Sequence, residues 1–163
     1  MRKLALVTTV ILLGASAAAA NYALADAPTK KPFDATVTQT ITGICSFPLE
    51  VTSSFRGFEL DFFDRTGALV RLDLHNVEQD TFVANGKTLV GEPFTFNLFV
   101  SFENGEVTAV LARGVAEKVR LPNAKLFLSA GVIDFLAQGV AFSLTTDRGR
   151  TGDIDAFCAA LAP

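Results

Sequence analysis

Apolar residues recur at every second position along most of this chain, and this period of two constrains the fold more than any other feature. In the first such stretch, the apolar members are Phe33, Ala35, Val37 and Ile41. In the second they are Phe47, Leu49, Val51 and Phe55, after which the alternation shifts onto Phe58, Leu60 and Phe62. Alternation of this kind predicts half-buried β-strands. The shift occurs at Arg56-Gly57, and a shift at a glycine predicts a bulge or a corner.

Three turn sequences are expected to join these strands into hairpins. Asn85-Gly86 and Asn104-Gly105 each lie between alternating segments, which is the strongest short-range hairpin signal. Arg65-Thr66-Gly67 fits a three-residue loop with glycine at its left-handed position. The pairs that this loop would place opposite each other are Phe62 with Val70 and Asp61 with Arg71.

The whole pattern predicts an all-β domain of eight to ten short strands connected by hairpins. Further strands are expected at residues 114–121, 124–136 (with a kink at Gly131) and 140–146, followed by a polar loop at 147–153. Residues 154–161 form either a last helical turn or a closing strand. An antiparallel barrel is the favoured architecture, because it leaves no free edges, and a β-sandwich is the alternative.

The N-terminus has the features of a secretory signal peptide. Arg2 and Lys3 precede an apolar run at residues 4–13, and Ala23-Leu24-Ala25 fits a cleavage site. An uncleaved membrane anchor is the alternative, since residues 4–20 are nearly long enough to span a bilayer. We therefore expect a signal peptide at 1–25, a flexible lead-in at 26–32 and a single β-domain at 33–163. The mature protein would be secreted, without a stable membrane span.

The two cysteines, Cys45 and Cys158, fit an oxidising compartment and predict one disulfide. The sequence has no C-x-x-C motif and one histidine, which argues against a redox or zinc site. In a barrel, this bridge would hold the first and last strands together.

Composition narrows the choice of partner. The formal charge is −3, and removing Arg2 and Lys3 makes it −5, which argues against nucleic-acid binding. The chain has 15 Phe, one Tyr and no Trp, whereas sugar- and base-binding sheets favour Trp and Tyr. The phenylalanines therefore either fill a core or line a cavity for an apolar small molecule. The candidate lining residues, which share one face with Val107, Ala109 and Leu111, are Phe94, Phe96, Leu98 and Phe102.

Two apolar pairs are expected on the opposite, outer face. The Asn104-Gly105 turn would place Phe99 beside Val110, and the earlier loop would place Phe63 beside Leu69. Outward apolar pairs indicate either cover by another segment or an interface with a partner or a second copy of the chain. All four residues are candidate interface residues.

No set of residues carries a recognisable catalytic or metal motif, so no cofactor is expected. His75 lies near Asp73 and Arg71, but no nucleophile motif accompanies it, and a solvated strand face is the expected role. The loop carboxylates Asp147, Asp153 and Asp155 do not have EF-hand spacing. The carboxylate pairs Glu59–Asp61 and Glu103–Glu106 are expected on outward strand positions and at turn flanks, not in a glycosidase site.

The sequence resembles a group of small secreted actinobacterial proteins of unknown activity. The shared marks are the leader, the Cys45-Ser46-Phe47-Pro48 segment, the Asn85-Gly86 hairpin and the terminal residues 153–158. The resemblance implies no activity. The sequence favours an exported, non-enzymatic β-domain that binds an apolar small molecule, a partner protein or itself. The alternatives are an enzyme on a dirigent-like or cyclase-like barrel, held on fold analogy, and a structural envelope component.

Overall fold

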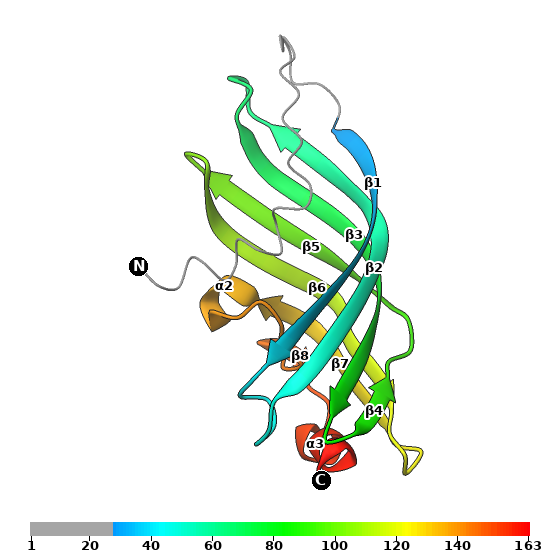
Figure 1. The fold of residues 1–163 in the computed structure, drawn as a ribbon. Helices are drawn as coiled ribbons and strands as arrows, with labels where there is room; N and C mark the ends of the chain where they lie inside the picture. The colour runs from blue at the N-terminus through cyan, green and yellow to red at the C-terminus, as the bar shows by residue number, and fades with distance from the viewer. Residues whose placement is uncertain (1–27) are drawn as a thin grey trace.

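The computed structural model describes residues 28–163, so the expected signal peptide lies outside the described residues. The domain is all-β and consists almost entirely of antiparallel strands (Figure 1). The strands are β1 (Thr29–Ile41), β2 (Leu49–Phe63), β3 (Leu69–Ala84), β4 (Lys87–Val90), β5 (Phe94–Glu103), β6 (Glu106–Arg120), β7 (Leu126–Asp134) and β8 (Arg148–Arg150). Two short helices, α2 (Phe135–Gln138) and α3 (Ile154–Leu161), follow β7 and β8. Within the described residues, no helix is long and apolar enough to cross a membrane.

All eight strands belong to one sheet, which is strongly curved and does not close on itself. The order is β1-β2-β3-β5-β6-β7-β8, and β4 pairs with the end of β3. Figure 1 shows the long strands β1, β2, β3, β5 and β6 bending together, with α3 at one end of the sheet. Because β1 and β8 are the two ends of the pairing order, the sheet formed by residues 28–163 is open and is not closed by hydrogen bonds into the expected barrel.

One face of the sheet, here called the inner face, carries the hydrophobic core in two separate clusters. The larger cluster packs α3 against the ends of β2, β3 and β7, with Phe157 between Phe82 and Phe127 at ring-centroid distances of 5.0 and 5.1 Å. The smaller cluster, around Leu72, Val100 and Val110, also receives Phe135 from α2. Polar residues occupy the inner face between the two clusters.

A row of paired residues that is rich in glycine crosses the sheet beside these polar residues. The successive partners in this row are Phe33, Gly57, Asn76, Phe96, Gly114, Gly131 and Gly149. Gly114, Gly131 and Gly149 have φ angles of 135°, 151° and 127°, and a Cβ on Gly131 would lie 2.0 Å from the carbonyl oxygen of Arg148. Only glycine fits such a close approach of strands, and glycines in strands typically mark bends. The row therefore accounts for the sharp curvature of the sheet.

The strand boundaries differ from the sequence expectations in two places, and one expected change of face is absent. β1 starts at Thr29, inside the expected lead-in, and residues 140–146 form loop instead of strand. Residues 154–161 are helical, which decides between the two alternatives for this segment. The expected shift at Arg56-Gly57 is wrong, because β2 pairs continuously with β1 and β3 across Gly57. Consequently Phe58, Leu60 and Phe62 stay on the outer face, and Asp61 is the buried residue.

All three predicted turns are confirmed, but two of the registers are shifted by bulges. Asn85-Gly86 and Asn104-Gly105 have positive φ at both residues, and Gly67 has φ 84° in a loop closed by Asp64 and Ala68. An irregularity after Phe62 pairs Asp61 with Leu72, not with Arg71. Another after Ser101 pairs Phe99 with Leu111 and Val100 with Val110. A single extra residue reverses the face of every residue beyond it, which the alternation alone did not reveal.

The predicted disulfide between Cys45 and Cys158 is present, with a Cα–Cα distance of 5.5 Å. It joins the loop between β1 and β2 to helix α3, instead of the first strand to the last strand. Asp153 caps α3 by accepting a hydrogen bond from the Ala156 amide at 2.9 Å. The bridge and the cap hold α3 over the larger core cluster.

Candidate functional site

Three carboxyl groups meet on the inner face between the two core clusters. Glu78 and Asp80 come from β3 and Glu117 comes from β6; we call them the carboxyl triad. Asp80 and Glu117 are both 0% exposed, whereas Glu78 is only partly buried. Buried carboxyl groups are normally paired with cations or hydrogen-bond donors. Within the described residues, no Lys or Arg forms an ion pair with any member of the triad.

Local breaks in strand regularity place the triad. The pairing of β6 with β7 shifts between Val115 and Glu117, which turns Glu117 onto the inner face opposite Ser129. On the other side of the triad, β4 ends and β5 has not begun, and Gly91 fills the gap. A Cβ on Gly91 would lie 3.0 Å from both the Asp80 carbonyl oxygen and Glu117 Oε1. Bulges of this kind often direct a side chain toward a functional site.

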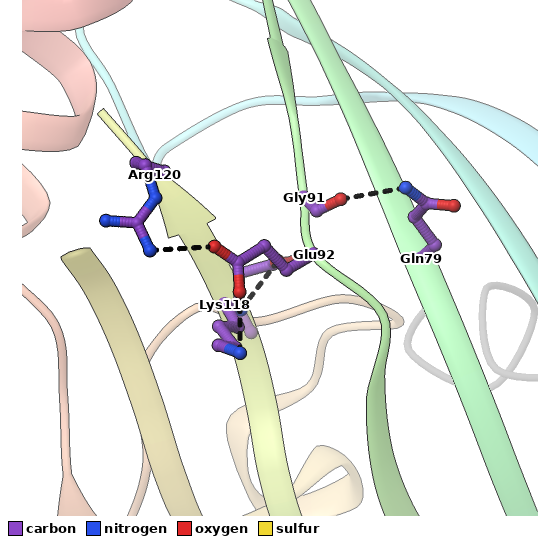
Figure 2. Close-up of polar contacts among 6 residues, drawn as sticks. Gln79, Gly91, Glu92, Lys118 and Arg120 are labelled. Atoms are coloured by element: carbon purple, nitrogen blue, oxygen red, sulfur yellow. Dashed lines mark hydrogen bonds and ion pairs between the residues drawn. The ribbon is translucent and has the colours of Figure 1, made fainter. Parts of the chain in front are cut away.

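The segment between β4 and β5 forms hydrogen bonds with β3 and ion pairs with β6 (Figure 2). Gln79 donates to the Gly91 carbonyl at 2.9 Å, and the Gly91 amide donates to the Asp80 carbonyl at 2.7 Å. Glu92 forms ion pairs with Lys118 at 2.6 Å and with Arg120 at 3.2 Å. These contacts hold residues 91 and 92 in place beside the triad.

The pKa values of the two glutamates in the triad are raised by their surroundings. Burial raises the pKa of Glu78 well above its ordinary value, helped by repulsion from Asp80 and a hydrogen bond with it, while Ser53 acts in the opposite direction. Burial and the same two effects of Asp80 raise the pKa of Glu117, opposed by the Lys118 amide, which donates to Oε1 at 2.8 Å. Both glutamates therefore hold a proton to a higher pH than an ordinary glutamate does, and in the protonated form each can donate a hydrogen bond to Asp80.

The surrounding protein leaves three oxygen atoms of the triad without a donor. They are Asp80 Oδ1, Asp80 Oδ2 and Glu117 Oε2. Ser129 faces Glu117, but its hydroxyl donates to the Leu144 carbonyl at 2.6 Å and accepts from the Gly152 amide at 3.0 Å. The only proton of that hydroxyl is thus engaged elsewhere, so Ser129 does not donate a hydrogen bond to Glu117.

A second ionic cluster lies farther along the inner face. Lys31 of β1 forms ion pairs with Asp61 and, at 3.9 Å, with Glu59. Burial raises the pKa of Glu59 to about 7, together with the hydrogen bond and repulsion from Asp61, and Lys31 partly offsets this. The expectation that Glu59 and Asp61 are outward residues is wrong, because β2 does not change face at Gly57. Glu103 and Glu106 do flank the Asn104-Gly105 turn, as expected.

The four candidate cavity residues share the inner face, as the alternation predicted. Phe94 is 5% exposed and stacks on Phe96 at 6.1 Å, while Leu98 and Phe102 pack against the smaller core cluster. Of their expected companions, Val107 joins that cluster, but Ala109 and Leu111 lie beyond the bulge on the outer face.

A hollow of about 260 Å³ lies beside Glu78, and none of the four candidate cavity residues lines it. Its lining residues are Asp34, Ser54, Phe55, Arg56, Val77, Glu78, Gln79 and Pro93. Most of these occupy outer-face positions, so this hollow is not the Phe-lined cavity expected from the sequence.

The candidate interface residues do not share one surface in the structure. Val110 is 5% exposed in the smaller core cluster, so its expected outward pairing with Phe99 is wrong. Phe99 is on the outer face, where the Arg113 guanidinium lies 5.1 Å from its ring centroid. Phe63 and Leu69 do face each other, with Phe63 46% exposed, but Leu69 also packs against the smaller core cluster.

The remaining polar candidates have structural roles. His75 is exposed on the outer face and stacks on Phe58 at 4.5 Å, and Asp73 pairs with Arg71 at 2.9 Å. Asp147 accepts hydrogen bonds from the Asp134 amide and from Gln138, while Asp153 caps α3. Across residues 28–163, no three His, Cys, Asp or Glu side chains are arranged to hold a metal ion.

Sequence reasoning missed the triad, although a signal for it was present. The inward set Leu72 and Leu74 continues at every second residue through Glu78, Asp80 and Phe82 to Ala84. Extending the strand past His75 would have placed two acidic residues in the core. Glu117 had no comparable signal, because a bulge sets its direction.

Comparisons of the chain with protein-family models, with curated proteins and with solved structures gave no match.

Proposed function

We propose that this protein is an exported, non-enzymatic domain that binds an apolar small molecule on its inner face. One observation carries the proposal: apolar inner-face residues next to the triad are only partly buried, although the same face forms the core at both ends. On β1 and β2 these are Phe33, Ala35, Val37 and Phe55, and on β5 they include Phe96. Partly covered apolar surface of this kind is typical of ligand sites.

The curved sheet would then act as a half-open barrel, with β1 at the open side. Among the described strands, β1 pairs only with β2, and its inner-face side chains alternate with a polar outer row in which Thr36 and Thr38 form hydrogen bonds with Ser54 and Thr52. The outer row is therefore engaged within the sheet, whereas the inner row faces the proposed ligand space. Export agrees with the disulfide, which is stable in an oxidising compartment.

The test uses a neutral apolar fluorescent probe, N-phenyl-1-naphthylamine, and two tryptophan substitutions on adjacent residues of β1. Ala35→Trp should fill the inner face beside Phe55 and weaken probe binding at least tenfold. Thr36→Trp, on the outer face, is the matched control and should bind like the wild type. The melting temperature of each variant shows that it is folded. Absence of saturable binding to the wild type, or equal weakening in both variants, would refute the proposal.

The Lys31 cluster favours a second candidate function, acid–base catalysis on a cyclase-like scaffold. A carboxyl with a pKa near 7 beside an ammonium group is suited to proton transfer at neutral pH. If this function holds, ligand that co-purifies with the protein from its native source should be converted on incubation at pH 7. Glu59→Gln should still bind that ligand but leave it unchanged. A bound ligand that is never converted by the wild type would eliminate the enzyme.

A further inference from the structure

The one accessible carboxyl of the triad lies between aromatic rings. Glu78 faces Phe55 of β2 on one side and Phe94 of β5 on the other, so all three side chains share the inner face. Phe96 stacks on Phe94 and extends the aromatic surface toward Asn76. A ligand that lies on the proposed apolar surface would therefore meet Glu78 as its main polar contact.

Behind Glu78 lie two further carboxyl groups, those of Asp80 and Glu117, and no Lys or Arg of the described residues forms an ion pair with them. Asp80 and Glu117 are fully buried, and no described residue outside the triad donates a hydrogen bond to three of their oxygen atoms. On the inner face, the groups around Glu78 are Asp80 on its own strand, Glu117 on β6, Ser53 and Phe55 on β2, and Phe94 on β5, and none of them is a cation. On the outer face, the hollow beside Glu78 is also lined by Asp34 of β1 and Arg56 of β2.

We propose that the polar group of the bound ligand is an organic ammonium, which rests against Glu78 and the neighbouring phenylalanine rings. This inference rests on the function proposed above and specifies its ligand class. A cation is attracted both by carboxylates and by the faces of aromatic rings. A ligand carboxylate would be repelled by the triad, and a metal ion lacks a suitable arrangement of donors within the described residues.

Replacement of protons by the ligand cation has a measurable consequence. Glu78 and Glu117 would each lose affinity for a proton when the ammonium binds, so binding should release protons and become tighter as the pH rises. A quaternary ammonium does not titrate, so any pH dependence that it shows comes from the protein. The dependence therefore reports on the triad and not on the ligand.

The experiment is isothermal titration calorimetry of the mature exported protein with octyltrimethylammonium, 1-octanol and octanoate, each below its aggregation concentration. At pH 8 the ammonium should bind at least tenfold more tightly than the other two compounds. Its affinity should rise at least threefold between pH 6 and pH 8. Glu78→Gln should remove both effects, whereas Glu103→Gln, at the exposed end of a hairpin, should preserve them.

The outcomes separate this inference from the proposed function. Equal binding of octanol and the ammonium, or tighter binding of octanoate, would overturn the ammonium while leaving an apolar ligand site in place. If none of the three compounds binds saturably, both proposals fail. If Glu78→Gln does not fold, the ranking of the three compounds and the pH dependence of the wild type still decide the matter.

Discussion

Glu117 of β6 faces Asp80 of β3 across the inner face, and neither residue is exposed to solvent. The two are brought together by a bulge in β6 and by Gly91, which leaves room for the Glu117 carboxyl. Their contact places acidic groups at the centre of a sheet whose two ends are apolar.

The stability of the protein should decrease as the pH rises above about 5. Glu78 and Glu117 have higher pKa values in the folded chain than in the unfolded chain, where the ordinary value is 4.5. The folded state therefore binds more protons, and this stabilisation is complete below the unfolded value and lost as the pH rises through the folded values. Urea unfolding at a series of pH values measures the effect.

Glu117→Gln should weaken that pH dependence. The amide cannot ionise and can donate a hydrogen bond to Asp80, so at pH 9 the variant should be about 1–3 kcal/mol more stable than the wild type. Glu103→Gln, at a turn flank, is the control and should follow the wild-type curve. A Glu117→Gln variant that is less stable than the wild type at pH 9 would contradict this explanation.

The disulfide should contribute substantially to stability. Cys45 and Cys158 close a loop with a sequence separation of 113, for which the chain-entropy relation gives about 4–5 kcal/mol. Replacing both cysteines with alanine should lower the free energy of unfolding by up to this amount while far-UV circular dichroism still shows strand content. Alkylation of the native protein should detect no thiol, and two reactive thiols per chain would be inconsistent with the bridge.

Because of the bulge after Ser101, Val110 and Phe99 lie on opposite faces of the sheet, so polar substitutions at the two positions should lower stability by different amounts. Val110→Asp would bury an unpaired charge in the smaller core cluster and should cost about 3–5 kcal/mol. Phe99→Lys, on the outer face beside Arg113, should cost about 1 kcal/mol. Chemical denaturation of the two variants gives the comparison. Similar costs would mean that both residues share a face and that the bulge is absent.

His75 should be dispensable for folding and for binding. It is exposed and contacts Phe58 by stacking on the outer face, away from the triad. His75→Gln should change the free energy of unfolding by no more than about 0.5 kcal/mol. The affinity for octyltrimethylammonium, measured by isothermal titration calorimetry, should be the same as in the wild type. Loss of binding in a folded variant would place the site on the outer face instead.

The sequence was informative wherever a local rule decides the structure. Asn85-Gly86 and Asn104-Gly105 specify tight turns because their residues accept positive φ, and the two cysteines leave one pairing. The register beyond a turn was less predictable. The bulge after Ser101 depends on how β5 and β6 pack against the rest of the sheet, and alternation does not encode it.

The candidate site was harder to predict than the fold for a related reason. Acidic residues in a strand normally indicate a solvated face, so Glu59, Asp61, Glu78 and Asp80 did not stand out as inner residues. Their burial follows from the uninterrupted pairing of β2 with β3. Whether a carboxyl is buried thus depended on the register of the whole sheet, which nearest neighbours in sequence do not determine.

The most direct test of this account is the protonation state of the triad, measured by ¹³C NMR of the glutamate side-chain carboxyl groups during a pH titration. Glu78→Gln and Glu117→Gln assign the two resonances that matter. We predict that both resonances titrate at a pH well above 4.5, the ordinary value for a glutamate side chain. If both titrate at or below this ordinary value, burial does not hold protons on the triad and the ligand class inferred from it is wrong.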